Sequence, residues 1–266
     1  MIKFKMAVVG KDVSESLSPE IHTFIMNKLG VEIKYDKVSV DPNNFKEEFP
    51  KILSTYDTLN ITIPYKLDVI PYMNELKEDG KIFMSVNTIE CKNKYGYNTD
   101  GAGFMLMIEN AGISAKNKTI LVLGTGGVGR TVIKKLVTEG GIVSAFDLNQ
   151  EGLKELYNEF PKFTALSELE NKHYDIIINC TGVGMHKSVG KSPVSEDLIK
   201  LCDSAVDLIY VPEKSEFLRL AEVNGKKICN GESMLFYQAY YADCIFLNRK
   251  CDNQEAKKLF LEFRNK

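Results

Sequence analysis

A glycine-rich loop in the middle of the chain constrains the fold more than any other stretch. Gly124-Thr125-Gly126-Gly127-Val128-Gly129-Arg130 follows the apolar run 119–123 and precedes a helical pattern over 127–139. A G-x-G-x-x-G loop between a strand and a helix lets a pyrophosphate approach the backbone and the helix N-terminus. A strand-to-helix turn without a ligand is the alternative, but the β-α-β pattern around the loop favours nucleotide binding.

A carboxylate closes the next strand of this unit. Asp147 follows the apolar run 142–146 and stands 23 residues after Gly124. There it can accept hydrogen bonds from both adenosine ribose hydroxyls, which favours NAD. It would also repel a 2′-phosphate, by about 4 kcal/mol at roughly 4 Å and an effective dielectric near 20 before screening. Capping of the following helix is the alternative, and Arg130 could still contact a phosphate, so NADP stays possible.

Strand and helix patterns alternate along the whole chain, so the predicted class is α/β. Strands are expected at 6–10, 33–40, 57–63, 85–91, 95–97, 119–123, 142–146, 174–179, 204–209 and 226–229. Helices are expected at 19–29, 43–55, 65–76, 101–111, 127–139, 150–159, 213–224, 233–248 and 253–264. The later strands are apolar throughout, which is typical of a doubly wound parallel sheet with helices on both faces.

Two domains are predicted, with boundaries near residues 100 and 232. Residues 1–100 are expected to form an α/β substrate-binding catalytic domain, completed by the C-terminal helices within 232–266. Residues 101–231 are expected to form a Rossmann-like dinucleotide-binding domain.

Composition argues against several classes of protein. The chain has 266 residues, 44% of them hydrophobic, and a formal net charge of −2 without a long run of like charge, so neither a nucleic acid nor a membrane is an expected partner. Its first ten residues are apolar too briefly for a signal peptide or a membrane span. The six cysteines lack CxxC spacing and the three histidines are scattered, which predicts reduced thiols, no metal and a cytoplasmic location.

Three short polar stretches outside the glycine-loop unit carry candidate chemistry. They are Ser16-Leu17-Ser18-Pro19, the stretch 60–66, and Asn98-Thr99-Asp100-Gly101, each beside a predicted strand end or helix start. Such ends converge on a crevice in α/β proteins. In a partly desolvated cleft Lys66 can donate or accept a proton, and Asp100 would orient its ammonium group. Taken alone, a solvated surface lysine and a helix-capping aspartate stay the alternatives.

Seven motifs follow one another over most of the chain. They are Ser16–Pro19 with His22, Asn60–Lys66, Ser85–Thr88, Gly96–Gly103, Gly124–Arg130, Asp207–Pro212 and Gly231–Gln238. In this order they resemble the shikimate dehydrogenase family, which includes quinate/shikimate dehydrogenases. The resemblance implies reversible oxidation of shikimate to 3-dehydroshikimate with a nicotinamide cofactor, a step of aromatic amino acid biosynthesis.

The resemblance also implies a role for each matching residue. Lys66 would be the acid/base, paired with Asp100. The substrate would be bound by Ser16 and Ser18 at its carboxylate, by Thr62, Asn87, Asp100 and Gln238 at its ring hydroxyls, and by Tyr210 nearby. The cofactor would be bound by Gly124, Thr125, Gly126, Gly127, Val128, Arg130, Asp147 and Leu148, with Leu208 and Gly231 near the nicotinamide.

Two features bear on specificity. NADP-using members of the family carry an Asn-Arg-Thr-like stretch at this place, whereas this chain has Asp147-Leu148-Asn149. The acid in place of the arginine favours NAD, as in the quinate/shikimate branch. The serines at positions 16 and 18 resemble the shikimate-specific branch. A quinate or aminoshikimate dehydrogenase, a non-catalytic nucleotide-binding paralogue and a two-domain folate dehydrogenase are the alternatives, and the oligomeric state is left open between monomer and homodimer.

Overall fold

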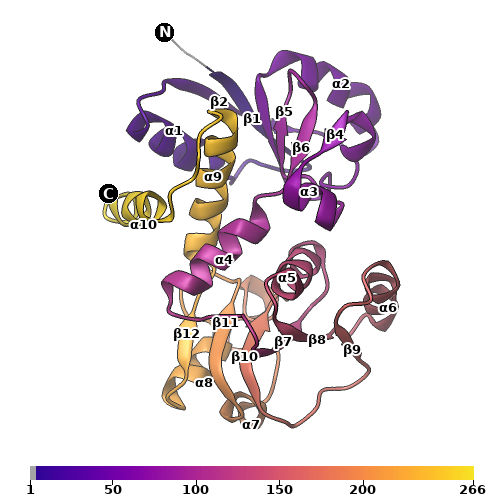
Figure 1. The fold of residues 1–266 in the computed structure, drawn as a ribbon, viewed down its shortest axis with the longest axis vertical. Coiled ribbons are helices and arrows are strands. Elements are labelled where there is room, and N and C mark those ends of the chain that lie inside the picture. Colours follow the sequence, from indigo (N-terminus) through magenta and orange to yellow (C-terminus); the bar gives the residue numbers. More distant parts are fainter. Residues whose placement is uncertain (1–3) are drawn as a thin grey trace. The chain divides into compact units, whose positions relative to one another are not determined.

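The computed structural model describes residues 4–266, which form two compact units (Figure 1). Unit 1 contains the chain up to Gly103 together with Phe236–Lys266, and unit 2 contains Phe104–Leu235. The chain passes between the units inside two helices, α4 (Asp100–Asn110) and α9 (Glu232–Phe246). Unit 1 is therefore built from both ends of the chain.

Unit 1 is organised around a six-stranded mixed sheet with the order β2-β1-β3-β5-β6-β4. Its strands are β1 (Phe4–Gly10), β2 (Ile33–Ser39), β3 (Thr58–Ile61), β4 (Glu75–Leu76), β5 (Thr88–Glu90) and β6 (Tyr95–Tyr97). The pairs β1–β2, β1–β3 and β4–β6 are parallel, whereas β3–β5 and β5–β6 are antiparallel. The β5–β6 hairpin confirms the two strands predicted at 85–91 and 95–97, and Lys94 in the turn between them adopts a φ of 54°.

The helices of unit 1 pack around this sheet. They are α1 (Ser18–Lys28), α2 (Phe45–Thr55), the 3₁₀ turn η1 (Ile70–Tyr72), α3 (Glu78–Phe83) and α10 (Asn253–Arg264), together with the unit 1 parts of α4 and α9. On one side of the sheet the aromatic rings of Phe45 and Tyr65 stack with centroids 4.1 Å apart, and Phe49 stacks on Phe45 at 4.9 Å. Burial of such large rings supplies much of the hydrophobic free energy of a core.

The prediction of a helix over 65–76 is wrong. Val69 donates its N–H to the carbonyl of Tyr65 at 3.1 Å, but the chain then tightens into η1 and leaves it extended at Met73. Pro71 explains the difference, because it lacks an N–H group and its ring clashes with the carbonyl four residues earlier. The helix α3, which was not predicted, follows instead.

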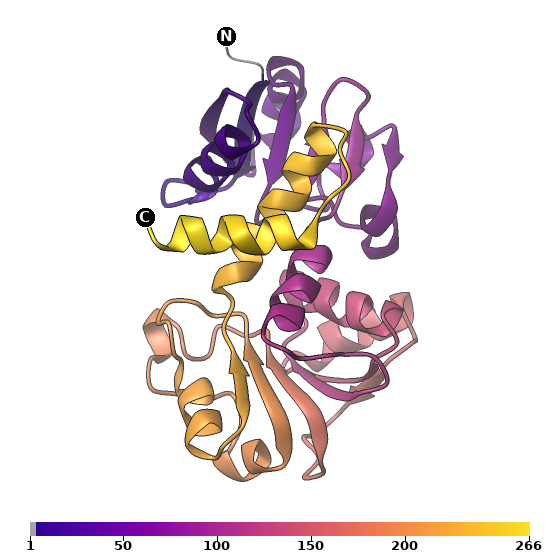
Figure 2. The same ribbon diagram turned by 60° about the vertical axis from the view of Figure 1, so that its left-hand side comes forward.

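Unit 2 contains a six-stranded sheet with the order β12-β11-β10-β7-β8-β9. Its strands are β7 (Thr119–Leu123), β8 (Ile142–Phe146), β9 (Thr164–Leu166), β10 (Tyr174–Asn179), β11 (Cys202–Asp207) and β12 (Lys227–Cys229). Every pair is parallel, which confirms the parallel sheet expected for this part of the chain (Figure 2). The order reverses between β10-β7 and β7-β8, so β7 leads into the switch point at which α/β sheets bind ligands.

The helices that lie wholly within unit 2 begin, except for the first, at a side-chain cap. They are α5 (Gly127–Thr138), α6 (Gln150–Glu159), α7 (Glu196–Lys200) and α8 (Glu216–Val223), with a 3₁₀ turn η2 (His186–Ser188). The side chains of Asn149, Ser195 and Ser215 accept backbone N–H groups in the first turns of α6, α7 and α8. Such caps fix the start of a helix.

Within residues 4–266 no helix has the length and apolarity needed to cross a bilayer. The cytoplasmic location and the choice between monomer and homodimer stay predictions from the sequence.

Candidate active site

Lys66 and Asp100 form the charged centre of unit 1. The Lys66 ammonium donates to Asp100 Oδ2 at 2.6 Å, and the two side chains are 21% and 10% exposed. Lys66 lies in the turns after β3, and Asp100 is the first residue of α4. The antiparallel pairing of β3 with β5, and of β5 with β6, brings these two positions together across 34 residues of sequence. A lysine held in this way keeps access to solvent while its ammonium group is oriented.

Asn87 fixes the second oxygen of the same carboxylate. Its Nδ2 donates to Asp100 Oδ1 at 2.8 Å and to Thr99 Oγ1 at 3.1 Å, and its Oδ1 accepts the Thr99 N–H at 2.9 Å. Asn98 Oδ1 in turn accepts the Asp100 backbone N–H at 3.0 Å. Each Asp100 oxygen therefore has a different partner, and the carboxylate is held in one orientation.

Two serine hydroxyls lie at the start of α1. Ser16 Oγ donates to Ser18 Oγ at 3.1 Å and accepts the Ser18 N–H at 3.2 Å, and the pair is partly shielded from solvent. The first turn of a helix leaves backbone N–H groups without intrahelical partners and carries a partial positive charge. Hydroxyls at this position suit an anion such as a carboxylate.

Thr62 stands four residues before Lys66, and Gln238 packs beside the first turn of α4, which begins with Asp100. Thr62 is half-buried in the turn that leads to Lys66, and its carbonyl accepts the N–H of Tyr65 at 3.0 Å. Gln238 on α9 lies against Gly103 on α4, because a Cβ at Gly103 would stand 2.7 Å from the Gln238 backbone nitrogen. Glycine at this position therefore allows the close approach of α9 to the first turn of α4.

A buried polar chain in unit 1 was not predicted. The Tyr35 hydroxyl donates to Asn60 Oδ1 at 2.8 Å, and the buried Asn60 Nδ2 has no hydrogen-bond partner among residues 4–266. The Tyr35 ring stacks on His22 at 5.0 Å, and His22 Nδ1 lies 2.6 Å from Asp243 Oδ1, with both side chains fully buried. Burial raises the pKa of Asp243, and the contact with His22 opposes that rise. The pair His22–Asp243 had no local signal, because 221 residues separate its members.

The glycine loop of unit 2 leaves open space at the N-terminus of α5. A Cβ at Gly129 would stand 2.1 Å from the Gly124 carbonyl oxygen, so the loop can close tightly only with glycine there. A Cβ at Gly126 or at Gly127 would meet nothing of the described chain within 4 Å. A tight turn, an uncovered backbone and the free N–H groups of a helix start fit a dinucleotide pyrophosphate.

Asp147 follows β8 and faces the glycine loop. Its Oδ2 accepts the Thr125 N–H at 2.6 Å and the Thr125 hydroxyl at 2.8 Å, and its Oδ1 accepts the Asn149 N–H at 2.8 Å. Burial alone would raise the pKa of Asp147, but these hydrogen bonds lower it below its ordinary value. The carboxylate is therefore charged at neutral pH. Leu148 beside it is 89% exposed.

Arg130 is held by an acid on a neighbouring helix. Its guanidinium donates to Glu159 Oε2 at 2.7 Å, and Lys134 contacts the other oxygen of Glu159. Val128, two residues earlier in the first turn of α5, is half-buried. Arg130 is thus engaged by a carboxylate of its own unit.

The segment after β11 is ordered by a buried carboxylate that was given no role from the sequence. Asp207 accepts from Asn179 Nδ2 and from the Ile209 N–H, both at 3.0 Å, and from the Ser215 hydroxyl at 2.5 Å. Burial raises the pKa of Asp207, and these donors oppose the rise. Leu208, which follows Asp207, donates its N–H to the Asn179 carbonyl at 3.0 Å.

The position of Gly231 depends on its lack of a side chain. A Cβ there would stand 2.1 Å from the Leu208 carbonyl oxygen, and the Gly231 N–H donates to the Ile209 carbonyl at 3.2 Å. Tyr210 is 41% exposed. Gly231 therefore packs against the backbone of Leu208 and Ile209 within unit 2. Tyr210 belongs to the same unit, whereas the other residues predicted to bind substrate lie in unit 1.

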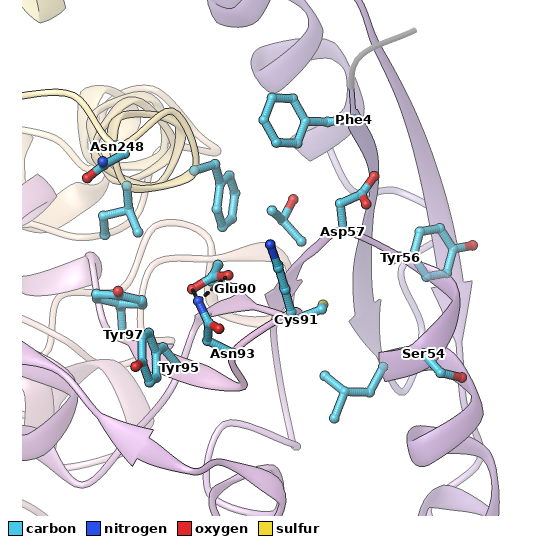
Figure 3. Close-up of a pocket in the computed structure, with 15 residues that line it drawn as sticks. Phe4, Ser54, Tyr56, Asp57, Glu90, Cys91, Asn93, Tyr95, Tyr97 and Asn248 are labelled. Atoms are coloured by element: carbon cyan, nitrogen blue, oxygen red, sulfur yellow. Dashed lines mark hydrogen bonds between the residues drawn. The ribbon is translucent and has the colours of Figure 1, made fainter.

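A separate hollow of about 680 Å³ lies in unit 1 (Figure 3). It is bordered by the start of β1, the start of β3, the β5–β6 hairpin and the end of α9. Figure 3 shows Glu90 and Asn93 joined by hydrogen bonds within it. Its lining includes none of the residues predicted to bind substrate or cofactor, so it is distinct from the Lys66–Asp100 centre.

Unit 2 combines a parallel, doubly wound sheet with a glycine loop, and unit 1 carries a paired lysine and aspartate. Together these features define a two-domain nicotinamide-dependent oxidoreductase. The family model of the shikimate dehydrogenase substrate binding domain matches residues 8–89. The shikimate dehydrogenase (NADP(+)) of Clostridium beijerinckii is 34% identical over 265 residues, 97% of each chain. The chain belongs to the shikimate dehydrogenase family.

Solved structures agree with this assignment. A chorismate mutase/shikimate 5-dehydrogenase fusion protein from Clostridium acetobutylicum matches with a TM-score of 0.88 and 33% identity, over 98% of this chain and 97% of that one. Shikimate 5-dehydrogenase from Thermus thermophilus, solved in complex with NADP(H) and shikimate, matches with a TM-score of 0.86 and 27% identity, over 97% and 99% of the two chains. These similarities confirm the predicted α/β fold and the resemblance drawn from the seven motifs.

Proposed function

We propose that the protein interconverts shikimate and 3-dehydroshikimate with a nicotinamide cofactor, with NAD preferred. The observation that carries the proposal is the hydrogen-bonded pair of Lys66 and Asp100, 2.6 Å apart. Unit 1 would be the substrate-binding catalytic domain, and unit 2 would bind the dinucleotide.

Lys66 would move the proton of the reaction. In the direction of oxidation its amine accepts the proton of the ring alcohol, and in reduction its ammonium returns that proton to the carbonyl oxygen. Asp100 keeps the amine in place, because Asn87 in turn holds the carboxylate from its other side. A bound nicotinamide would supply or accept the hydride.

The remaining polar groups of unit 1 would hold the substrate. Ser16 and Ser18 at the start of α1 suit its carboxylate, and Thr62, Asn87, Asp100 and Gln238 suit its ring hydroxyls. Tyr210 of unit 2 would also contact the substrate. Serine at both position 16 and position 18, rather than threonine at position 18, favours shikimate over quinate as the substrate.

The proposed preference for NAD differs from the cofactor in the names of the relatives, which is NADP(+). It is supported by the charged carboxylate of Asp147 and by the exposed apolar side chain of Leu148 at the neighbouring position. A 2′-phosphate near Asp147 would meet a like charge. Arg130, the cation of the glycine loop, is paired with Glu159. The other cofactor residues would be Gly124, Thr125, Gly126, Gly127, Val128, Leu208 and Gly231.

A matrix of two substrates against two cofactors tests the proposal. We expect the highest kcat/KM for shikimate with NAD, and at least about tenfold less with NADP, a ratio that corresponds to about 1.4 kcal/mol. Faster turnover of quinate would favour the quinate dehydrogenase alternative. Faster turnover with NADP would remove the cofactor preference and leave the reaction standing. Absence of turnover with all four pairs would favour a non-catalytic paralogue.

A double variant isolates the cofactor determinant. Asp147→Asn combined with Leu148→Arg removes a repelling charge and adds a phosphate-binding one, so the kcat/KM ratio should move toward NADP by about tenfold or more. Asp203→Asn, which neutralises an exposed carboxylate of the same unit, is the matched control. An unchanged ratio in the double variant would show that Asp147 does not select the cofactor.

A further inference from the structure

The chain folds back over the end of α9 immediately after that helix. The Arg249 N–H donates to the Cys244 carbonyl at 2.9 Å, and the Asp252 N–H donates to the Tyr240 hydroxyl at 3.0 Å. Tyr240 and Cys244 are four residues apart on one helix, so they share a face. The returning segment is thus fixed along that face by hydrogen bonds on both sides of Cys251.

This return brings two free thiols close enough to interact, Cys244 on α9 and Cys251 on the returning segment. Their interaction is the largest cause of the pKa shift of each thiol. Cys244 is completely buried, whereas Cys251 is half-buried and reachable from solvent. One thiol of the pair can therefore meet a small reagent first, and the other is protected behind it.

The surroundings of Cys251 favour its thiolate. It is partly exposed and stands two residues after the positively charged Arg249. The interaction with Cys244 lowers the pKa of Cys251, and the positive charge of Arg249 acts in the same direction, against burial and the charges of Glu78 and Glu255. The same interaction, together with burial, raises the pKa of Cys244.

The other four cysteines of the chain differ from Cys251 in that burial raises the pKa of each thiol above its ordinary value. Burial raises the pKa of Cys91 and of Cys229 to about 12, and that of Cys202 to about 11. Burial also raises the pKa of Cys180. Reactivity of a thiol toward oxidants follows its thiolate character and exposure, and a second thiol in contact resolves the product.

We propose that Cys251 and Cys244 form an oxidant-sensitive modification site, at which Cys251 reacts with a hydroperoxide and Cys244 closes a disulfide. In the first step the Cys251 thiolate attacks the terminal peroxide oxygen, so an S–O bond forms while the O–O bond breaks. The other peroxide oxygen leaves as an alkoxide, or as hydroxide from hydrogen peroxide, takes a proton from water, and Cys251 becomes a sulfenic acid. In the second, the Cys244 sulfur attacks the Cys251 sulfur, an S–S bond forms, and the oxygen leaves as water with the Cys244 proton. Two thiols are oxidised and one peroxide is reduced.

The test uses the full-length reduced protein treated with hydrogen peroxide, followed by alkylation of the remaining thiols and peptide mapping by mass spectrometry. We expect the loss of two alkylatable thiols and a peptide pair linked through Cys244 and Cys251, reversed by dithiothreitol. In Cys244→Ser, dimedone should label Cys251 as a sulfenic acid, because the resolving thiol is missing. In Cys251→Ser, the disulfide and the dimedone label should both be lost.

Cys202→Ser, which removes a buried thiol of unit 2, is the matched control and should leave the linked peptide pair unchanged. Circular dichroism of each variant checks that it is folded, and Cys251→Ala replaces Cys251→Ser where the serine variant is not. A linked pair that excludes Cys251 would overturn the proposal. Labelling of Cys251 no faster than that of Cys91 or Cys202 would overturn it equally.

Discussion

Asp100 uses its two carboxylate oxygens for two different neighbours, Lys66 on one side and Asn87 on the other. An ammonium group that is held but not buried can exchange its proton with a bound alcohol and with water. The motif around Lys66 was readable in the sequence because its residues are contiguous. The support from Asn87 depends on β-strand pairing, which the motif alone does not describe.

Replacing Lys66 tests the acid/base role directly. Lys66→Ala should lower kcat by roughly 10²–10⁴-fold, the usual contribution of a positioned proton donor, and should change the KM for shikimate little. Steady-state kinetics with shikimate measure both constants. Lys51→Ala, which breaks an exposed lysine–glutamate pair of the same unit, should change neither. An unaltered kcat in Lys66→Ala would remove the lysine from the chemistry.

The buried pair of His22 and Asp243 should matter to stability. Asp243→Ala leaves His22 without its partner in a fully buried position, so the free energy of unfolding should fall by about 3 kcal/mol. Urea unfolding followed by circular dichroism measures the change. Asp203→Ala breaks the exposed pair with His173 and should change the same free energy by less than about 1 kcal/mol. Equal effects of the two variants would contradict the argument from burial.

Among the elements, five of the six strands of unit 2 were predicted, because each of these five is a short apolar run between turn signals. Tyr65 and Val69 have helical spacing, but the helix expected over 65–76 does not form because Pro71 interrupts the pattern. Short edge strands such as β9 were not predicted, because three residues are too few to show a hydrophobic pattern. The helix α7 had a usable signal, since Ser195 stands at the N-cap before two acids.

The start of β7 is tied to β10 by one aspartate. Asp175 accepts from the Lys118 ammonium at 2.6 Å and from the N–H and hydroxyl of Thr119, both at 2.7 Å. These hydrogen bonds hold the pKa of Asp175 well below its ordinary value. A carboxyl group with a lowered folded-state pKa stabilises the fold above its unfolded-state pKa, and this stabilisation is lost as the pH falls toward the folded-state pKa.

Asp175→Asn should therefore lower the free energy of unfolding by about 1–2 kcal/mol at pH 7, with the charge on Lys118 partly screened by solvent. The difference from the unsubstituted protein should shrink as the pH falls below about 4. Urea titrations at several pH values measure it. Asp197→Asn, at a 90% exposed side chain, should show no such trend. A difference that is independent of pH would contradict the assignment.

On the scale of the whole molecule, the proposed substrate groups and the proposed cofactor groups belong mainly to different units. Shikimate alone should slow hydrogen exchange around Lys66 and Asp100 in unit 1. NAD alone should slow it around Gly124 and Asp147 in unit 2. Mass spectrometry of exchanged peptides separates the two regions, and protection of unit 1 alone by NAD would contradict the division of roles.

The assembly of unit 1 from both ends of the chain has a consequence for synthesis on the ribosome. Met6 and Met26 pack in one cluster with Ala242 and Phe246 of α9, so part of the first strand's core is supplied by residues made more than two hundred positions later. At roughly 5–20 residues per second, that partner emerges many seconds after β1. The middle of the polypeptide should then mature before its beginning, and the nascent first hundred residues should bind chaperones until the last helices arrive.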